Sequence, residues 1–448
     1  MIVDCTPRVV AVALPERADP LPRVTTTLAT GFAVVASLAP GLLPRGPLTQ
    51  AVLTALLVAL ALGAARAVPN RDRTSGDPSE VADRGAVLAL TGCAVLVGCA
   101  AAWLWQNTLR AAMAAPLITP AHWALWALFS TALLTAPALL VRGVRLAPRR
   151  AAVGALALGV ATAVLVPLPP GAQAVASPNS PLPYTRSGSA HSTVAWDSLG
   201  TQGRRFVADG SADAVRVYIG LDSARTLDDR VTLALRELRR TGGLARRHLV
   251  LAVPTGSGWL DAGAAQGMES RFAGDVAVVA LQYSAAPSWV TFVTGRERAA
   301  ESARALFTAL ERELTALPDP PRLYVYGQSL GAWGGSAVFA DDADQRRRTC
   351  AVLWAGPPAG AVHRAGATVL ANRSDPVVHW SPRLLWHRPD LTATRPDAPV
   401  PEWQPVLSFL QTGADLLGAL DAPAGHGHRY GTDQGTALGD CAAHLAPK

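Results

Sequence analysis

The spacing of apolar residues divides the chain into two halves of different character. The first half holds long apolar segments with almost no internal charge, separated by short polar stretches. These segments run over residues 24–43, 48–66, 86–105, 119–141 and 151–168. Because about 20 apolar residues cross roughly 30 Å of hydrocarbon, the pattern predicts an all-α transmembrane helical domain of about five spans over 24–168. Four or six spans remain open alternatives.

The second half alternates short apolar runs with amphipathic stretches. The runs at 214–219, 248–253, 275–282, 323–326, 351–354, 367–370 and 406–410 predict strands, and the stretches at 227–240 and 299–317 predict helices. Repeated strand-then-helix units favour an α/β fold with a mostly parallel sheet and helices on both faces. Ligands of such sheets bind beyond the carboxyl ends of the strands, so functional residues are expected there.

Two segments without such a pattern complete the domain map. Residues 1–23 are polar, lack the apolar core of a signal peptide and are predicted to be a cytoplasmic tail. Residues 169–190 are rich in Pro, Ser and Gly and are predicted to link the membrane domain to an α/β domain at 191–448. The composition agrees, because 50% hydrophobic and 16% charged residues are unusual for a wholly soluble enzyme.

The net charge of +7 comes from arginines that are scattered or flank the apolar segments. Since the chain shows no basic helix with interleaved aromatic residues, no nucleic-acid partner is predicted. Arginines are most frequent in the tail and in the loops after the second and fourth apolar segments. By the positive-inside rule these parts are cytoplasmic. Five spans would then place the α/β domain on the extracytoplasmic face.

Residues 323–335 carry the most specific motif. The apolar run 323–326 leads directly into Gly327-Gln328-Ser329-Leu330-Gly331, and small residues then open a helix. A strand, G-x-S-x-G and a helix in this order are typical of a nucleophile elbow. The turn is so tight that a Cβ at Gly327 or Gly331 would collide with its neighbours. Ser329 is therefore expected in strained backbone with its Oγ exposed.

An elbow serine of this kind needs an acid and then a histidine later in the chain. Asp375 lies in the turn after the 367–370 strand, where a carboxylate would orient an imidazole. A turn aspartate before a proline is also common for local reasons. Lesser candidates for the acid are Asp390, Asp397 and Asp415.

The base is expected in a glycine-rich loop near the C-terminus, where His426 and His428 stand two residues apart. The flanking glycines let this loop bring a ring over the elbow, and we favour His428 while His426 stays open. A His-x-His metal pair is the alternative. It is disfavoured because no further His or Cys has the spacing of a ligand.

The oxyanion hole is predicted from two backbone segments. The N–H of Leu330 opens the helix after the nucleophile, where free amides and the helix dipole favour an anion. The loop after the 248–253 strand supplies Gly256, Ser257 and Gly258. Small residues there let backbone amides approach a developing oxyanion, although the same residues also suit a plain tight turn.

These motifs together resemble bacterial α/β-hydrolase-like membrane proteins, which combine a multi-span N-terminal region with a C-terminal hydrolase domain. The matching words are Leu42-Leu43-Pro44-Arg45, Ala195-Trp196-Asp197-Ser198-Leu199-Gly200, Pro254-Thr255-Gly256-Ser257-Gly258-Trp259, Leu281-Gln282-Tyr283-Ser284, Gly327-Gln328-Ser329-Leu330-Gly331, Trp354-Ala355-Gly356-Pro357-Pro358, Ser374-Asp375-Pro376-Val377-Val378 and Gly425-His426-Gly427-His428. The resemblance covers nearly the whole chain and implies an α/β-hydrolase fold for 191–448. It supplies no substrate, since fold does not fix function.

The sequence therefore predicts an integral membrane serine hydrolase that cleaves acyl esters or thioesters of lipid or cell-envelope components. Its partners would be that acyl substrate and membrane lipids, with no cofactor and no metal. An acyltransferase would use the same residues, and a non-catalytic binding module could keep the same fold. Two cysteines of the α/β domain, Cys350 and Cys441, would be bridged only if folding brings their Cα atoms within about 7 Å. The sequence leaves that open.

Overall fold

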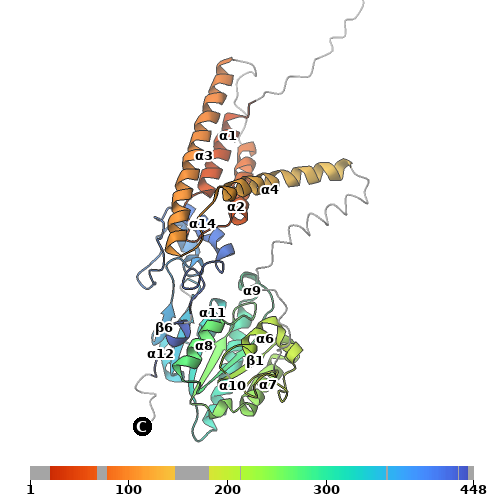
Figure 1. Cartoon of the computed structure of the whole chain (residues 1–448), viewed down its shortest axis with the longest axis vertical. Coiled ribbons are helices and arrows are strands. Elements are labelled where there is room, and N and C mark those ends of the chain that lie inside the picture. Colours follow the sequence, from red (N-terminus) through yellow and green to blue (C-terminus); the bar gives the residue numbers. More distant parts are fainter. Residues whose placement is uncertain are drawn as a thin grey trace, which may run out of the picture.

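The computed structural model describes residues 21–67, 78–146, 181–211, 213–359, 362–431 and 433–441. A group of long helices forms one end of the molecule, and a sheet flanked by helices forms the other (Figure 1). This division follows the two patterns of apolar residues in the sequence.

Four helices make up the first half: α1 (Val24–Ser37), α2 (Pro47–Ala67), α3 (Pro78–Ala112) and α4 (Pro120–Leu146). α1 packs against α2 and α3, and α2 packs against α4. Helices α1 and α2 pack side by side as a hairpin. Residues 38–46, which join α1 to α2 and are called the hairpin loop below, lie at the end nearer the sheet (Figure 1).

The prediction of about five spans is corrected by these helices. Among the described residues, two helices are long and apolar enough to cross a membrane, namely α2 and the part of α3 from Val81 to Ala112. Helix α1 is only 14 residues long and reaches about 21 Å, which is short of the hydrocarbon thickness. The fifth predicted span, 151–168, lies outside the described residues.

The second half contains six strands: β1 (Val215–Ile219), β2 (His248–Val253), β3 (Val276–Leu281), β4 (Arg322–Gln328), β5 (Ala351–Ala355) and β6 (Ala367–Leu370). They form one sheet in the order β1-β3-β2-β4-β5-β6, and every pair is parallel. All residues of β1, β3 and β5 are buried. Burial on both faces explains why these strands appear in the sequence as continuous apolar runs.

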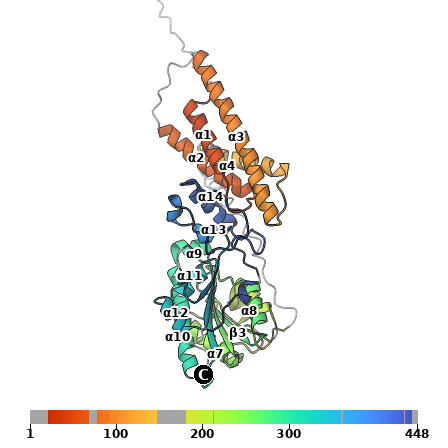
Figure 2. The same ribbon diagram turned by 90° about the vertical axis from the view of Figure 1, so that its left-hand side faces the viewer.

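Helices and short 3₁₀ turns connect and cover the strands. They are η1 (Trp196–Leu199), α6 (Gly200–Ala208), η2 (Leu221–Ser223), α7 (Leu227–Arg240), η3 (Gly243–Ala245), α8 (Ala262–Arg271), α9 (Ser288–Thr294), α10 (Glu297–Thr315), α11 (Leu330–Ser336), α12 (Asp342–Arg348), α13 (Pro376–His379), η4 (Pro382–Leu385), α14 (Leu407–Asp415), η5 (Leu416–Gly418) and α15 (Asp433–Thr436). Figure 2 shows α8 on the opposite side of the sheet from α10, α11 and α12. The parallel sheet with helices on both faces is therefore confirmed.

The strand order fixes where a site can form. Along the chain, β3 is added on one side of β2 and β4 on the other. The connections after β2 and β4 therefore diverge at the carboxyl edge and leave a crevice there. Val253 at the end of β2 pairs with Gly327 of β4. This register places the 254–259 loop next to the turn that holds Ser329.

Two predicted elements differ from the structure. Residues 406–410 form the start of helix α14 rather than a strand. The last part of the predicted linker packs on the sheet, because the Ser187 N–H donates to the Arg216 carbonyl at 3.1 Å. The packed α/β domain thus begins within the stretch 181–190.

Candidate active site

Ser329 sits at the turn between β4 and α11, as the motif predicts. Its φ of 57° and ψ of −125° put a non-glycine residue in a sparsely populated backbone region. The backbone N–H of Ser329 donates to the carbonyl of Ala355 at 2.9 Å, which ties the turn to the end of β5. The side chain is half-buried, so the Oγ is accessible at the carboxyl edge of the sheet.

The two glycines of the motif are required by close backbone contacts. A Cβ at Gly327 would collide with the carbonyl of Gly331 in α11. A Cβ at Gly331 would collide with the carbonyl of Val253 at the end of β2. Any side chain at either position would thus push apart the strand and helix that hold Ser329 in its strained conformation.

Asp375 and His428 form a buried pair. Asp375 follows β6 and caps α13, where its Oδ1 accepts the N–H of Val377 at 2.9 Å. Its Oδ2 lies 2.8 Å from the Nδ1 of His428, and both side chains are almost fully buried. An ionised carboxylate can only accept, so Nδ1 carries the proton and Nε2 is left as the basic nitrogen.

Tyr430 supplies a further donor to this carboxylate. Its hydroxyl lies 2.6 Å from the Oδ2 of Asp375. Burial, and next the charge of Asp375, raise the pKa of Tyr430 well above its usual value, so the hydroxyl stays protonated and donates. The rings of Tyr430 and His428 also meet edge to face. The hydrogen bond to Asp375 was not foreseen.

The backbone of His428 is fixed on both sides. Its N–H donates to the carbonyl of Ala419 at 3.1 Å, and its carbonyl accepts from the Nε2 of Gln328 at 3.2 Å. Gln328 directly precedes Ser329, so this bond brings the histidine loop to the elbow. A Cβ at Gly356 would lie 2.6 Å from the Cε1 of His428, which shows that the ring is seated against the turn after β5.

The Nε2 of His428 is buried and has no hydrogen-bond partner among the described residues, Ser329 included. The link from serine to histidine is therefore open in this structure. Such contacts are often long in ligand-free enzymes and close in the substrate complex. An unpaired buried nitrogen costs stability, and a proton from a neighbouring hydroxyl would satisfy it.

His426 has a different partner. Its Nδ1 lies 3.4 Å from the Oδ2 of Asp397, and Asp397 is held by the hydroxyl and the N–H of Ser374. The other lesser acid candidates also lie away from His428. Asp390 is fully exposed, and Asp415 is paired with Arg45.

The two predicted oxyanion segments lie side by side. The N–H of Leu330 belongs to the first turn of α11, where amides have no acceptor within the helix. In the loop after β2, the N–H of Gly258 donates to the carbonyl of Thr255 at 2.9 Å. This amide is thus engaged within the turn. The amides of Gly256 and Ser257 stay predictions for the oxyanion hole.

The comparisons with known proteins agree with this fold. The model of the alpha/beta-hydrolase family matches residues 215–368 and 363–443. A second model, the N-terminus of an alpha/beta-hydrolase family, matches residues 38–167 and 171–210. The chain belongs to the alpha/beta-hydrolase family. No curated protein matches the chain.

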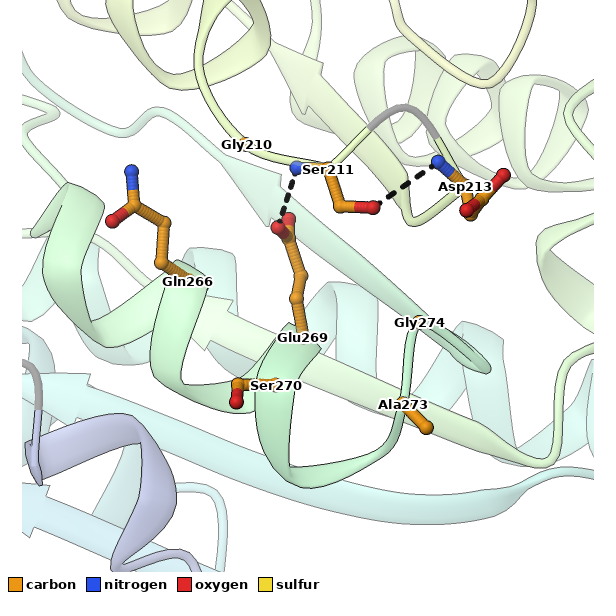
Figure 3. A pocket seen from close by; sticks show the side chains of 8 residues that line it. All are labelled: Gly210, Ser211, Asp213, Gln266, Glu269, Ser270, Ala273 and Gly274. Atoms are coloured by element: carbon orange, nitrogen blue, oxygen red, sulfur yellow. Dashed lines mark hydrogen bonds between the residues drawn. The ribbon is translucent and has the colours of Figure 1, made fainter.

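A surface cavity of about 520 Å³ in this alpha/beta-hydrolase is remote from these residues. Its lining residues Gly210, Ser211, Asp213, Gln266, Glu269, Ser270, Ala273 and Gly274 (Figure 3) precede β1 and β3 or belong to α8. They lie at the amino edge of the sheet, opposite Ser329. Glu269 accepts the Ser211 N–H (Figure 3) and pairs with the buried Arg216 at 2.6 Å, so its role here is structural.

Within the described residues, no group of three or more His, Cys, Asp or Glu side chains is placed to hold a metal ion.

Proposed function

We propose that this alpha/beta-hydrolase is a membrane-bound serine hydrolase that cleaves acyl esters. The observation that carries the proposal is the buried Asp375–His428 pair, joined through Gln328 to the elbow of Ser329. A strained serine in an elbow beside an oriented, neutral histidine is the arrangement that makes a hydroxyl nucleophilic.

The reaction then follows from the placement of these groups. The Oγ of Ser329 attacks the acyl carbonyl carbon while the Nε2 of His428 accepts the hydroxyl proton. The oxyanion forms against the amides of Leu330 and of the 256–257 turn. The tetrahedral intermediate collapses, and His428 returns the proton to the departing alcohol or thiol. Water repeats the sequence on the acyl-enzyme, and the acid is released with Ser329 restored.

Asp375 keeps one tautomer of the imidazole throughout. It has three donors, from Val377, Tyr430 and His428, which fix the direction of the carboxylate. An ionised acid at this place stabilises the imidazolium that forms when the serine proton arrives.

Lipid contact of the first half is supported by its exposed apolar surface. In the most apolar stretch of α3, within Val81–Ala112, only 6% of the residues are buried in the protein. Leu90, Leu96 and Val97 are about 70% exposed. Such a surface would be unstable in water and suits hydrocarbon. We propose α2 and α3 as two of the spans.

An extracytoplasmic position of the hydrolase domain is supported by two features. Arg66 near the end of α2 and Arg84 near the start of α3 flank the sequence between these helices, and arginine-rich loops are typically cytoplasmic; α3 begins at the end of the molecule far from the sheet (Figure 1). Cys350 and Cys441 form a disulfide with Cα atoms 4.3 Å apart, and such bridges persist mainly in oxidising compartments.

A lipid acyl ester is supported as the substrate class by the surface of α14 and η5. The side chains of Leu410, Leu417 and Leu420 are exposed there, while Gln411 and Asp415 on the other side of α14 are buried. This apolar stripe lies at the end of the molecule that carries the helices and ahead of the histidine loop, where an acyl chain could reach the site from the membrane.

Labelling with a fluorophosphonate probe tests the proposal. Full-length protein in native membranes should be labelled, and Ser329→Ala should lose all label. Hydrolysis of p-nitrophenyl acyl esters should fall by about three or more orders of magnitude in the same variant, because the triad acts as a unit. Equal labelling of both proteins, or no labelling of the wild type, would exclude the serine mechanism and leave the domain as a binding module.

A further inference from the structure

Arg45 of the hairpin loop is buried against the hydrolase domain. Its Nε lies 2.7 Å from the Oδ1 of Asp415, and its Nη2 donates to the carbonyl of Gln411 at 2.9 Å. Its Nη1 donates to the side-chain oxygen of Gln411. A buried guanidinium is tolerated only when its donors are matched in this way. These three residues, Arg45, Gln411 and Asp415, are called the Arg45 clamp below.

The clamp is closed from both sides. The Oδ2 of Asp415 accepts the N–H of Leu42 at 2.6 Å, and the Nε2 of Gln411 donates to the carbonyl of Ala36 at 2.6 Å. Gly41 is required here, because a Cβ would lie 2.7 Å from the Oδ2 of Asp415. Helix α14 is therefore fastened to the hairpin loop, and it lies between the long helices and the sheet (Figure 1, Figure 2).

Helix α3 supports the same loop. The N–H of Arg45 donates to the side chain of Gln106 at 2.9 Å, and Arg110 donates to the carbonyl of Arg45 at 2.8 Å. The loop is thus held by a membrane helix on one side and by the hydrolase domain on the other.

The clamp reaches the proposed base through two short connections. Ala419 stands four residues after Asp415, and its carbonyl accepts the N–H of His428 at 3.1 Å. Leu43 is buried with Ala422 in a small apolar cluster. A Cβ at Gly427 would lie 3.0 Å from the Cδ2 of Leu43. The residue before His428 therefore packs directly on the hairpin loop.

We propose that Arg45 and Leu43 are positioning residues, through which the helical half of the chain holds His428 over Ser329. The inference rests on the proposed function and deepens it. Ser329 is fixed by its own elbow and Asp375 by three donors of the hydrolase domain. Of these three residues, His428 belongs to a loop that packs on residues from outside that domain, because Gly427 and Ala422 lie against Leu43. The hydrolase domain is therefore competent for proton transfer only when the hairpin loop is docked.

The role predicts a specific kinetic pattern. Loosening the loop moves the base but leaves the nucleophile and the apolar stripe in place. In full-length protein, Arg45→Met and Leu43→Ala should each lower kcat by about 10- to 100-fold, because a displacement of about 1 Å can cost 100-fold. KM for a p-nitrophenyl ester should stay within about twofold. The matched control is Leu60→Ala on the exposed face of α2, which should leave kcat unchanged.

The double variant Arg45→Met with Asp415→Leu separates positioning from stability. Removing one partner leaves a buried unpaired charge, whereas replacing both by apolar residues usually restores stability. We expect the melting temperature of the double variant to return toward wild type while kcat stays low. Recovery of kcat together with the melting temperature would overturn the proposal, as would wild-type kcat in both single variants.

Hydrogen exchange supplies a readout that does not depend on activity. In Arg45→Met, exchange should accelerate over residues 419–430, including the amide of His428. It should stay unchanged at 325–333 around Ser329. Unchanged protection at His428 would refute the connection even if the enzyme reaction proved to be a different one. If the wild type is not labelled by the fluorophosphonate probe at Ser329, the proposed function alone is refuted.

Discussion

The Cys350–Cys441 disulfide closes a loop that contains both partners of the buried acid–base pair. Cys350 leads β5, and Cys441 follows α15, 91 residues later. In the chain-entropy model, closing a loop of this length raises the free energy of unfolding by about 4.5 kcal/mol at 25 °C. For a domain of about 250 residues this corresponds to a fall in melting temperature of roughly 9–18 °C on reduction. We treat this range as an upper bound, because bridges often deliver less than the model.

The assay compares thermal unfolding of the solubilised protein with and without reductant, and repeats it with Cys350→Ala/Cys441→Ala. That variant should melt where the reduced wild type melts and should no longer respond to reductant. Cys93→Ala on α3 is the control, because Cys93 is a free cysteine, and it should keep the full response. Peptide mapping after alkylation should find Cys350 and Cys441 blocked before reduction. Alkylation of both in unreduced protein, or no shift on reduction, would refute the reasoning.

The two histidines and the tyrosine of the loop give two further predictions. His428→Ala should lower turnover in the ester assay as much as Ser329→Ala does. His426→Ala loses the contact with Asp397 and should keep measurable turnover. The reverse order would move the base to His426. Tyr430→Phe keeps the ring but removes one donor from Asp375, so melting should detect a loss of about 1.5–3 kcal/mol, the usual value for a hydrogen bond to a charged group, with kcat lowered and KM unchanged. An unaltered melting temperature would show that the hydroxyl does not hold the carboxylate.

Strands and helices were predictable from the sequence where the spacing of their apolar residues shows which faces are buried. The strand at 248–253 and the helix at 227–240 match the structure residue for residue. A parallel strand covered on both faces leaves a continuous apolar run, and a helix over a sheet leaves a stripe. The strand–turn–helix around Ser329 was also predictable, because the contacts that require its two glycines are local. They lie within one βα unit and the end of the neighbouring strand.

The stretch 406–410 was mistaken for a strand because five apolar residues fit either structure. Its helix is decided by distant contacts. Gln411 and Asp415, one helical turn apart, face the hairpin loop some 370 positions earlier in the chain. No local pattern carries that information.

The same contact explains the error in the first span. The apolar segment 24–43 has the length of a membrane helix, but α1 ends at Ser37. Leu42 and Leu43 are apolar because they are buried in a cluster with Leu109 and Met113 of the helical half and Ala422 of the hydrolase domain, not because they meet lipid. Apolar composition records that a residue is removed from water and does not record what covers it.

The choice between His426 and His428 shows the same limit inside the site. Both rings stand on one glycine-rich loop, and both have a carboxylate within reach, so residue type and spacing cannot separate them. The difference lies at Gly356, where the missing side chain makes room for the ring of His428. That glycine belongs to the Trp354-Ala355-Gly356-Pro357-Pro358 motif, which had no predicted role. A glycine with φ of 53° at the carboxyl end of a strand beside the elbow is thus the signal that favours His428 as the partner of Asp375. Gly356→Ala should displace His428 and leave His426 with Asp397.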